Sequence, residues 1–312
     1  MHQETARLIE LDRAHTLVAH IGAVLGWDQE TYMPPKAIEE RSDQLALIEG
    51  LAHQKAVDPE IGELLATLEA KNDLDPVEKA YVRVMRREYD RETKFPEAFV
   101  TEYAKAASMS QAAWAEARKN NDFASFAPHL ERMLQLNREK ASYLNPSAKP
   151  YDVLLDLFEP GSTRASVEKV FNVMKSYLVD ILGRIHACPQ IEDKCHGLKV
   201  DREAQEKISR YLMKVLGYDR ARGRLDVSAH PFTTTLGADD VRITTRYLED
   251  YFPSSLFSTI HESGHALYEL GIDPHPEYRG TRLAEAASMA VHESQSRLWE
   301  NIIGRSYAFW EH

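Results

Sequence analysis

Signals that start helices recur along the first two thirds of the sequence. Asp58-Pro59 and Asp75-Pro76 each place a capping aspartate before a proline at the first helical position, and Phe95-Pro96 opens an alanine-rich segment. Apolar residues after these starts recur at helical spacing. The pattern predicts a mainly α fold in which residues 1–223 form helices joined by short turns. The expected helices are 8–21, 37–54, those opening at 58, 75 and 95, 122–144, 163–182 and 201–216.

Two breaks are expected in this helical part. The segment Trp27–Pro35 carries polar residues and ends in a Pro-Pro pair, so it is predicted to be a turn. A loop is predicted from Cys188 to Gly197. The Cys and His residues in and beside this loop do not have the spacing of a zinc finger, so we expect no structural metal there. They are His186, Cys188, Cys195 and His196.

The sequence pattern changes near Arg224. Residues 225–237 are rich in Thr and Val without a helical period, and Val241–Tyr247 alternates apolar and polar residues. We therefore expect 225–248 to form a small hairpin or sheet. A helical pattern over 254–270 follows at once, and the predicted helix carries the motif that bears most directly on function.

This motif is His261-Glu262-Ser263-Gly264-His265, of the form H-E-x-x-H. Residues four apart lie one above the other on a helix, so both imidazoles can face one metal ion. Zinc accepts such nitrogens at about 2.0–2.1 Å. Glu262 lies roughly 100° around the helix, beside the open coordination position, where it can take a proton from a zinc-bound water. The motif predicts a zinc peptidase with Glu262 as general base.

A glycine between the two histidines supports this interpretation. Gly264 costs about 1 kcal/mol of helix stability, and we expect it to leave room for substrate or metal. The alternative is that His261 and His265 are buried histidines satisfied by hydrogen bonds. A chance match to the motif is on the order of a few per cent in a sequence with 13 His.

A catalytic zinc also needs a third protein ligand and an open position for water. A second helix is predicted over 284–300, and it places Glu293 in the polar cluster His292-Glu293-Ser294-Gln295. Polar groups are costly to bury unless they bind something, so Glu293 is favoured over Glu285. The alternative for such residues is a solvated helix face. The downstream candidates are Glu277, Glu285, Glu293 and Glu300.

The composition narrows the class of partner. With 49 Asp and Glu against 38 Lys and Arg, the net charge of −11 lacks the basic footprint that nucleic-acid binding requires. No run of 18 apolar residues is present, and the first residues do not resemble a secretory signal. Two cysteines are too few for a disulfide framework. We expect a cytoplasmic protein that binds neither nucleic acid nor a membrane.

Four motifs together resemble the carboxypeptidase Taq family of zinc metallocarboxypeptidases. Their order and spacing follow the family's pattern, and Trp27-Asp28 with Met33-Pro34 resembles its N-terminal region. The resemblance therefore spans essentially the whole chain. The four motifs are His261-Glu262-Ser263-Gly264-His265, His292-Glu293-Ser294-Gln295, Asp240-Val241-Arg242-Ile243-Thr244 and His230-Pro231-Phe232.

The resemblance implies roles for individual residues. Glu262 would be the base that activates water and then protonates the leaving amine. His292 would contact substrate or support the metal site, and Asp240, Arg242 and His230 would position substrate or support the ligands. For Arg242 the alternative is a structural ion pair. The implied ligands of zinc, or of cobalt as its substitute, are His261, His265 and Glu293.

The resemblance also implies a fold and an assembly. The fold is a helical zinc-peptidase fold with a deep groove of the neurolysin or angiotensin-converting-enzyme type, and the assembly is a homodimer. We expect one catalytic region over 1–312, with a helical lid part at 1–150 and a zinc-binding part at 151–312. The family's later motifs, I/V-R-x-x-A-D and G-x-x-Q-D-x-H-W, do not occur here. The chain is therefore expected to be the N-terminal portion of such a protein, without the other wall of its groove.

The predicted function is zinc-dependent hydrolysis of C-terminal residues from peptides, with broad specificity. Two alternatives stay open. One is a zinc oligopeptidase of the neurolysin or angiotensin-converting-enzyme type, which cleavage of C-terminally amidated peptides would favour. The other is an inactive fragment that binds metal, which equal activity of this chain and of a longer chain would reject.

Overall fold

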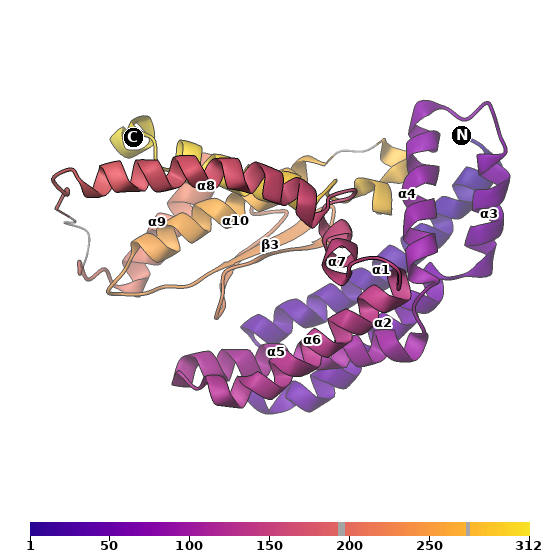
Figure 1. Cartoon of the computed structure of the whole chain (residues 1–312), viewed down its shortest axis with the longest axis horizontal. Coiled ribbons are helices and arrows are strands. Elements are labelled where there is room, and N and C mark those ends of the chain that lie inside the picture. Colours follow the sequence, from indigo (N-terminus) through magenta and orange to yellow (C-terminus); the bar gives the residue numbers. More distant parts are fainter. Residues whose placement is uncertain (193–196, 273–274) are drawn as a thin grey trace.

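The computed structural model describes residues 1–192, 197–272 and 275–312. Helices dominate, and one small sheet lies next to helix α10 (Figure 1). The prediction of a mainly α fold with a sheet beside the motif helix is confirmed. Cys195 and His196 of the predicted loop lie outside the described residues. The longer helices of the first half are α1 (Gln3–Thr31), α2 (Ile38–Ala56), α3 (Pro59–Glu69), α4 (Pro76–Glu92), α5 (Glu97–Asn120) and α6 (Phe123–Leu144).

The two Asp-Pro signals start helices as expected. The Asp58 side chain accepts a hydrogen bond from the backbone N–H of Glu60 at the start of α3. At the start of α4, Asp75 and Glu78 satisfy each other's backbone N–H groups in a capping box. These caps use local hydrogen bonds, so the helix starts can be predicted from the sequence alone.

The predicted turn at Trp27 is wrong, because α1 continues to Thr31 and the chain turns only at Tyr32. Nothing in Trp27–Thr31 breaks a helix, and the Pro34-Pro35 pair acts only after the helix has ended. The extra turn carries a buried Trp27, whose ring lies under the guanidinium of Arg242 at 4.3 Å and near that of Arg224 at 5.2 Å. Helix α1 thus contacts the sheet at this end.

The main core joins α1, α3 and α4 to a segment far along the chain. Leu8, Leu65 and Tyr81 are fully buried, and the ring of Tyr278 packs on Tyr81 with centroids 5.1 Å apart. The hydroxyl group of Tyr81 donates a hydrogen bond of 3.0 Å to the buried carboxylate of Asp12. The N-terminal helices are therefore attached to the part of the chain that follows α10.

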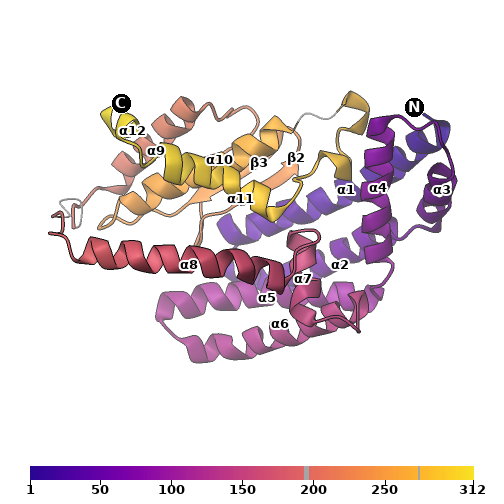
Figure 2. The same ribbon diagram turned by 45° about the horizontal axis from the view of Figure 1, so that its top comes forward.

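The middle of the chain forms α7 (Pro150–Phe158), α8 (Arg164–His186) and α9 (Arg202–Leu216). Helix α8 lies along one side of the molecule and has no buried residue (Figures 1 and 2). Its large apolar side chains are exposed, Phe171 by 61% and Tyr177 by 69%. Helix α9 instead buries Leu212 and Leu216 against α10. None of the helices in the described ranges is long and apolar enough to cross a membrane.

The sheet has three strands in the order β1-β3-β2, with β3 (Asp240–Thr245) in the middle. Strand β1 (Leu225–Val227) runs parallel to β3, with Leu225 opposite Ile243. Strand β2 (Thr233–Gly237) runs antiparallel to β3, with Thr233 opposite Ile243. Val241 and Ile243 are fully buried against Ala266 of α10 (Pro253–Gly271). The sheet therefore supports the helix that carries the H-E-x-x-H motif.

The second predicted helix, over 284–300, begins later than expected. Residues 282–284 form a 3-10 turn, and α11 covers Met289–Arg297, with the Ser288 hydroxyl capping the N–H of Val291. A π-helical turn follows at Leu298–Ile303, and α12 covers Tyr307–Glu311. Ser288 is a good N-cap, which is why the helix starts after it. The described 3-10 turns elsewhere are 35–37 and 276–278.

Candidate metal-binding active site

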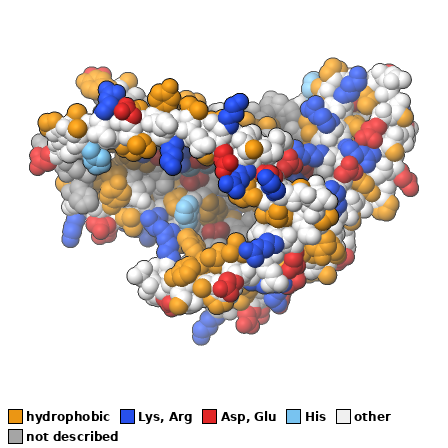
Figure 3. Space-filling view, viewed as in Figure 1, with side chains coloured by type: hydrophobic (Ala, Val, Ile, Leu, Met, Phe, Trp, Pro, Cys, Tyr) orange, Lys and Arg blue, Asp and Glu red, His pale blue; other side chains and the backbone are white. Residues whose placement is uncertain are grey.

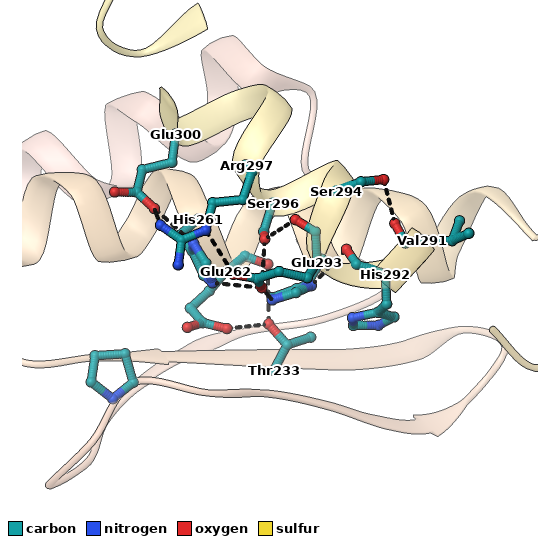
Figure 4. A network of polar contacts seen from close by, with 12 residues as sticks. Thr233, His261, Glu262, Val291, His292, Glu293, Ser294, Ser296, Arg297 and Glu300 are labelled. Carbon is teal, nitrogen blue, oxygen red and sulfur yellow. Dashed lines mark hydrogen bonds and ion pairs between the residues drawn. The ribbon is translucent and has the colours of Figure 1, made fainter. Parts of the chain in front are cut away.

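Helix α10 presents its two histidines toward α11. The opposite side of α10 is fixed by apolar contacts, because Ile260 is fully buried against Leu212 and Leu216 of α9. His261 is then left on the side that faces Glu293 of α11 (Figure 4). His265, one helical turn further along, faces the same carboxylate. Seen from the side of Figure 1, the surface of the molecule is hollowed in the middle, between α8 and the α5–α6 pair (Figure 3).

Three side chains form the one group of potential metal ligands found among the described residues: His261, His265 and Glu293. Their ligand atoms all lie within 4.8 Å of one another. Glu293 Oε2 is 3.5 Å from His261 Nε2 and 3.2 Å from His265 Nε2. The three residues that the sequence predicted as ligands are thus brought together.

The spacing of these atoms fits a tetrahedral metal ion. Two ligands at 2.0–2.1 Å from a tetrahedral centre are separated by about 3.3 Å, close to the 3.5 and 3.2 Å observed. A carboxylate oxygen and a neutral imidazole nitrogen both present lone pairs, so their contact is repulsive unless a cation lies between them. The donor set therefore fits a resident metal on geometry and on charge.

The opposite nitrogens of both imidazoles have acceptors of their own. His261 Nδ1 lies 2.8 Å from Glu300 Oε2, and His265 Nδ1 lies 3.1 Å from the backbone oxygen of His292. We assign the proton to Nδ1 in each ring, because both partners can only accept. This tautomer directs the Nε2 lone pairs at Glu293. Such contacts behind a ligand orient the ring and raise its basicity.

Glu300 is held by the π-helical turn after α11. Only 8% of the residue is exposed, and its carboxylate also accepts hydrogen bonds from Arg305 at 2.9 Å and Arg297 at 3.2 Å. Burial acts to raise the pKa of Glu300, but the hydrogen bonds from Arg305 and His261 outweigh it and lower the pKa. Glu300 is therefore ionised and serves as an anionic partner of His261.

Glu262 lies on the sheet side of α10, next to the ligands. It is 5% exposed, and its Oε2 accepts a hydrogen bond of 2.6 Å from the hydroxyl of Thr233 on β2 (Figure 4). Burial raises the pKa of Glu262, and the Thr233 hydrogen bond only partly opposes this. A carboxyl group whose pKa is raised is a stronger base than an ordinary glutamate, so it can accept a proton and later return it.

Two of the three predicted ligands, His265 and Glu293, are poised in the unprotonated form. Burial, together with the charges of His292 and His261, lowers the pKa of His265 to about 4. Burial acts to raise the pKa of Glu293, but hydrogen bonds from Arg297 and Ser296 outweigh it and lower the pKa. Metal ions bind the deprotonated forms of both groups.

The structural role of Gly264 differs from the predicted one, which was to leave room for substrate or metal. A Cβ atom at this position would lie 2.7 Å from Ser296 Cα and 2.9 Å from the Gln295 backbone oxygen. The glycine therefore allows the backbones of α10 and α11 to approach closely, rather than leaving room for substrate or metal. This approach is what brings Glu293 within reach of the two histidines.

His292 supports the site through its backbone and its ring. Its backbone oxygen accepts from His265, and its ring stacks on that of His265 with centroids 4.3 Å apart. Its Nε2 lies 2.8 Å from Glu269 Oε1, on the next turn of α10. The resemblance implied that His292 either contacts substrate or supports the metal site. Its contacts with His265 favour the second role.

Asp240 and Arg242 bind each other rather than the ligands. Arg242 Nε and Nη2 donate to the two oxygens of Asp240 at 2.8 and 2.7 Å, and the guanidinium stacks on Trp27. Within the described residues, neither side chain makes a hydrogen bond or ion pair with His261, His265 or Glu293. The pair attaches β3 to α1, so the structure favours the alternative of a structural ion pair for Arg242.

The remaining predicted residues lie outside the ligand group. His230 is exposed before β2, its Nδ1 is 2.7 Å from the Pro231 backbone oxygen, and its ring lies 6.4 Å from that of Trp114. Glu277 is exposed. Glu285 lines a separate cavity, and burial among protein atoms raises its pKa to about 7.

Sequence reasoning missed two functional contacts. Thr233 belongs to none of the predicted motifs, although it directly follows His230-Pro231-Phe232 and begins the strand beside α10. Glu300 is predicted only as a candidate ligand, whereas it binds the other nitrogen of His261. Its position two turns after Glu293 was a usable signal, because both residues point toward α10.

The comparisons with known proteins agree on one family. The model of the carboxypeptidase Taq (M32) metallopeptidase family matches residues 7–312. The chain is 41% identical to thermostable carboxypeptidase 1 of Thermus thermophilus over 317 residues, which cover 97% of this chain and 62% of that protein. It is 38% identical to carboxypeptidase 1 of Bacillus subtilis over 290 residues, or 92% of this chain and 58% of that protein.

Solved structures show the same likeness. The structure titled BsuCP crystal structure superposes with a TM-score of 0.95 at 35% identity, covering 99% of this chain and 62% of that one. The M32 carboxypeptidase of Deinococcus radiodurans R1 gives a TM-score of 0.87 at 39% identity, covering 99% and 62%. The chain thus spans about 60% of the length of the relatives it matches.

Proposed function

The chain belongs to the carboxypeptidase Taq (M32) metallopeptidase family, and from that premise we propose that it is a zinc-dependent metallocarboxypeptidase. It hydrolyses C-terminal residues from peptides with broad specificity. One observation carries the proposal: His261 and His265 direct Nε2 at Glu293 Oε2, beside the buried Glu262. Two imidazoles and one carboxylate are a donor set that catalytic zinc sites use. Cobalt is the proposed substitute.

The roles of the chain's own residues follow from the geometry. A metal ion held by the three ligands would polarise the scissile carbonyl and lower the pKa of an adjacent water. Glu262 accepts the proton of the attacking water and passes it to the leaving nitrogen. Thr233 fixes the Glu262 carboxylate through Oε2, which leaves Oε1 without a protein partner in the described part of the chain. Glu300 fixes the His261 ring.

The sharpest test of this mechanism is the Glu262→Gln variant. Glutamine keeps the shape and cannot take the proton, so we expect turnover of an N-blocked peptide to fall by roughly 10²–10⁴-fold or more. Zinc affinity should stay within a few-fold of the parent chain, because Glu262 is not a ligand. Normal turnover in this variant would reject Glu262 as the base, and lost zinc affinity would reject the ligand assignment.

Exopeptidase action is preferred over an oligopeptidase because the curated relatives are named carboxypeptidases. A peptide with a free C-terminal carboxylate should be cleaved, and its C-terminal amide should not. Since the chain spans about 60% of those relatives, the assay pairs this chain with full-length Bacillus subtilis carboxypeptidase 1. Turnover by the relative alone would favour an inactive metal-binding fragment.

The family resemblance also supports proposals about assembly and domains. We propose a cytoplasmic homodimer, in which residues 1–150 cover the groove and 151–312 bind the metal. Light scattering on the purified chain tests the dimer, because a dimer doubles the mass of a 35.6 kDa chain. A monomer at all concentrations tested would reject the homodimer for this chain.

A further inference from the structure

We propose that a pocket beside the metal centre binds a basic substrate side chain, one or two residues to the amino side of the scissile bond. This inference rests on the proposed peptidase function, because it assigns a subsite to that reaction. The pocket is a cavity of about 400 Å³ formed by α1, β2, the end of α10 and residues 279–286. Ligand pockets in proteins have volumes of this order.

The pocket lies beside the catalytic residues, further along β2 and α10. Thr235 of β2 lines it, and Thr233, whose side chain lies on the same face of the strand, contacts Glu262. Glu269 of α10 also lines it and lies one helical turn beyond His265. An extended peptide advances about 3.3 Å per residue. A substrate that passes the ligands along β2 therefore reaches the pocket within one or two residues.

The far wall is a face of α1, which the views in Figures 1 and 2 place beside the strands. Thr16 and His20, one turn apart, line the cavity. Thr16 is 6% exposed, and its hydroxyl has no hydrogen-bond partner among the described residues. A buried hydroxyl without a partner is costly, so this wall of the pocket contains an unused polar group.

The charge of the pocket is negative. Glu285 is an exposed residue that lines the pocket, and its carboxylate makes no hydrogen bond or ion pair within the described ranges. The second carboxylate of the pocket, that of Glu269, contacts His292 Nε2 through Oε1. Among the described lining residues Arg279 is the one arginine or lysine, and its guanidinium already forms an ion pair with Asp239, which it shares with Arg222. With a pKa of about 7, the Glu285 carboxyl group is ionised above neutral pH and is then a free acceptor for an ammonium or guanidinium group.

The same charge decides which side of the substrate the pocket receives. The residue removed by a carboxypeptidase carries a free carboxylate, which Glu269 and Glu285 would repel. A residue on the amino side of the scissile bond has no such charge. Its lysine or arginine side chain can extend past Thr235 to Glu285, with its hydrophobic stem along the cavity wall.

The test uses peptide binding to the metal-free chain, so that hydrolysis does not interfere. The probes are acetyl-Ala-Lys-Phe and acetyl-Lys-Ala-Phe, each compared with versions in which norleucine or glutamate replaces lysine. Ligand-detected NMR titration at about pH 8, where Glu285 is ionised, should show roughly tenfold tighter binding of one lysyl peptide than of its norleucyl counterpart, and weaker binding of the glutamyl peptide. Equal affinities, or no binding of either lysyl peptide, would overturn the proposal.

A matched pair of variants locates the effect. Glu285→Gln should reduce the lysine preference to near one, whereas Glu277→Gln, the same charge change at an exposed residue of the same segment that does not line the pocket, should keep it. Loss of preference in both would overturn the proposal. Turnover by the zinc-loaded chain is measured in parallel. Turnover without lysine preference rejects only the subsite, and Glu285-dependent binding without turnover rejects only the peptidase function.

Discussion

Glu300 Oε2 lies 2.8 Å from Nδ1 of His261, on the side of the ring opposite to the nitrogen that faces Glu293. The His261 imidazole thus joins Glu293, another predicted metal ligand, to the buried carboxylate of Glu300. Arg297 contacts both carboxylates, donating to Glu293 at 2.7 Å and to Glu300 at 3.2 Å. The ligand set is therefore part of a larger network of hydrogen bonds and ion pairs that orients its side chains.

The Glu300→Gln variant tests this supporting role. Glutamine can still accept a hydrogen bond but has no charge, so the basicity of His261 should fall and zinc affinity should drop by roughly 10–100-fold. Competition with a chromophoric chelator measures the affinity. The control is Glu311→Gln, an exposed carboxylate on α12, which should not change it. Unchanged affinity in Glu300→Gln would show that Glu300 does not support the ligand.

Gly264→Ala tests the close approach of α10 and α11. Alanine is the better helix former by about 1 kcal/mol, but its Cβ would clash with Ser296 Cα at 2.7 Å. We expect net destabilisation of about 1–3 kcal/mol and weaker zinc binding, measured by chemical denaturation and chelator competition. Gly183→Ala, inside α8 with open space around it, should instead be neutral or stabilising. Similar effects of the two substitutions would contradict the packing argument.

The lowered pKa of Glu78 predicts how the free energy of unfolding depends on pH. Burial acts to raise its pKa, but hydrogen bonds from His2, Thr5 and Asp75 outweigh it and lower the pKa from 4.5 to about 2. Because the folded-state pKa is depressed, this stabilisation is present above about pH 4.5 and is lost as pH falls toward 2. Glu78→Gln should cost about 2–3 kcal/mol at pH 7, and the difference from the parent chain should shrink below pH 4.5. A pH-independent difference in urea unfolding would reject this assignment.

Helix α8 and the main core should respond in opposite ways to truncation. Phe171 is 61% exposed, so Phe171→Ala should change stability by less than about 0.5 kcal/mol. Leu65 is fully buried, so Leu65→Ala should cost about 2–5 kcal/mol. Thermal unfolding of both variants measures the contrast. A large cost at Phe171 would show that α8 is covered in solution.

Local signals explain which parts of the fold could be predicted. The helix starts at Asp58 and Asp75 and the face shared by His261 and His265 depend on neighbours within a few residues, so the sequence is sufficient. The end of α1 was misjudged because a Pro-Pro pair marks where a helix cannot continue, not where it stops. The late start of α11 follows from the cap at Ser288, a signal that the pattern over 284–300 obscured.

Contacts between elements explain what could not be predicted. Gly264 is needed because of the α11 backbone, and no spacing within α10 reveals that neighbour. The spacing of Glu293 and Glu300 indicates that both face α10, but only the three-dimensional structure shows that Glu300 contacts Nδ1 of His261 instead of joining the ligands. Asp240 and Arg242 form a motif whose partner is Trp27, more than two hundred residues earlier.

The central claim is that His261, His265 and Glu293 hold one zinc ion. The most direct measurement is zinc stoichiometry together with X-ray absorption on the parent chain and on Glu293→Gln and His265→Ala. We expect one zinc per chain with nitrogen and oxygen ligands at about 2.0–2.1 Å, and a large loss of affinity in both variants. Zinc bound through sulfur, or unchanged binding in both variants, would contradict it.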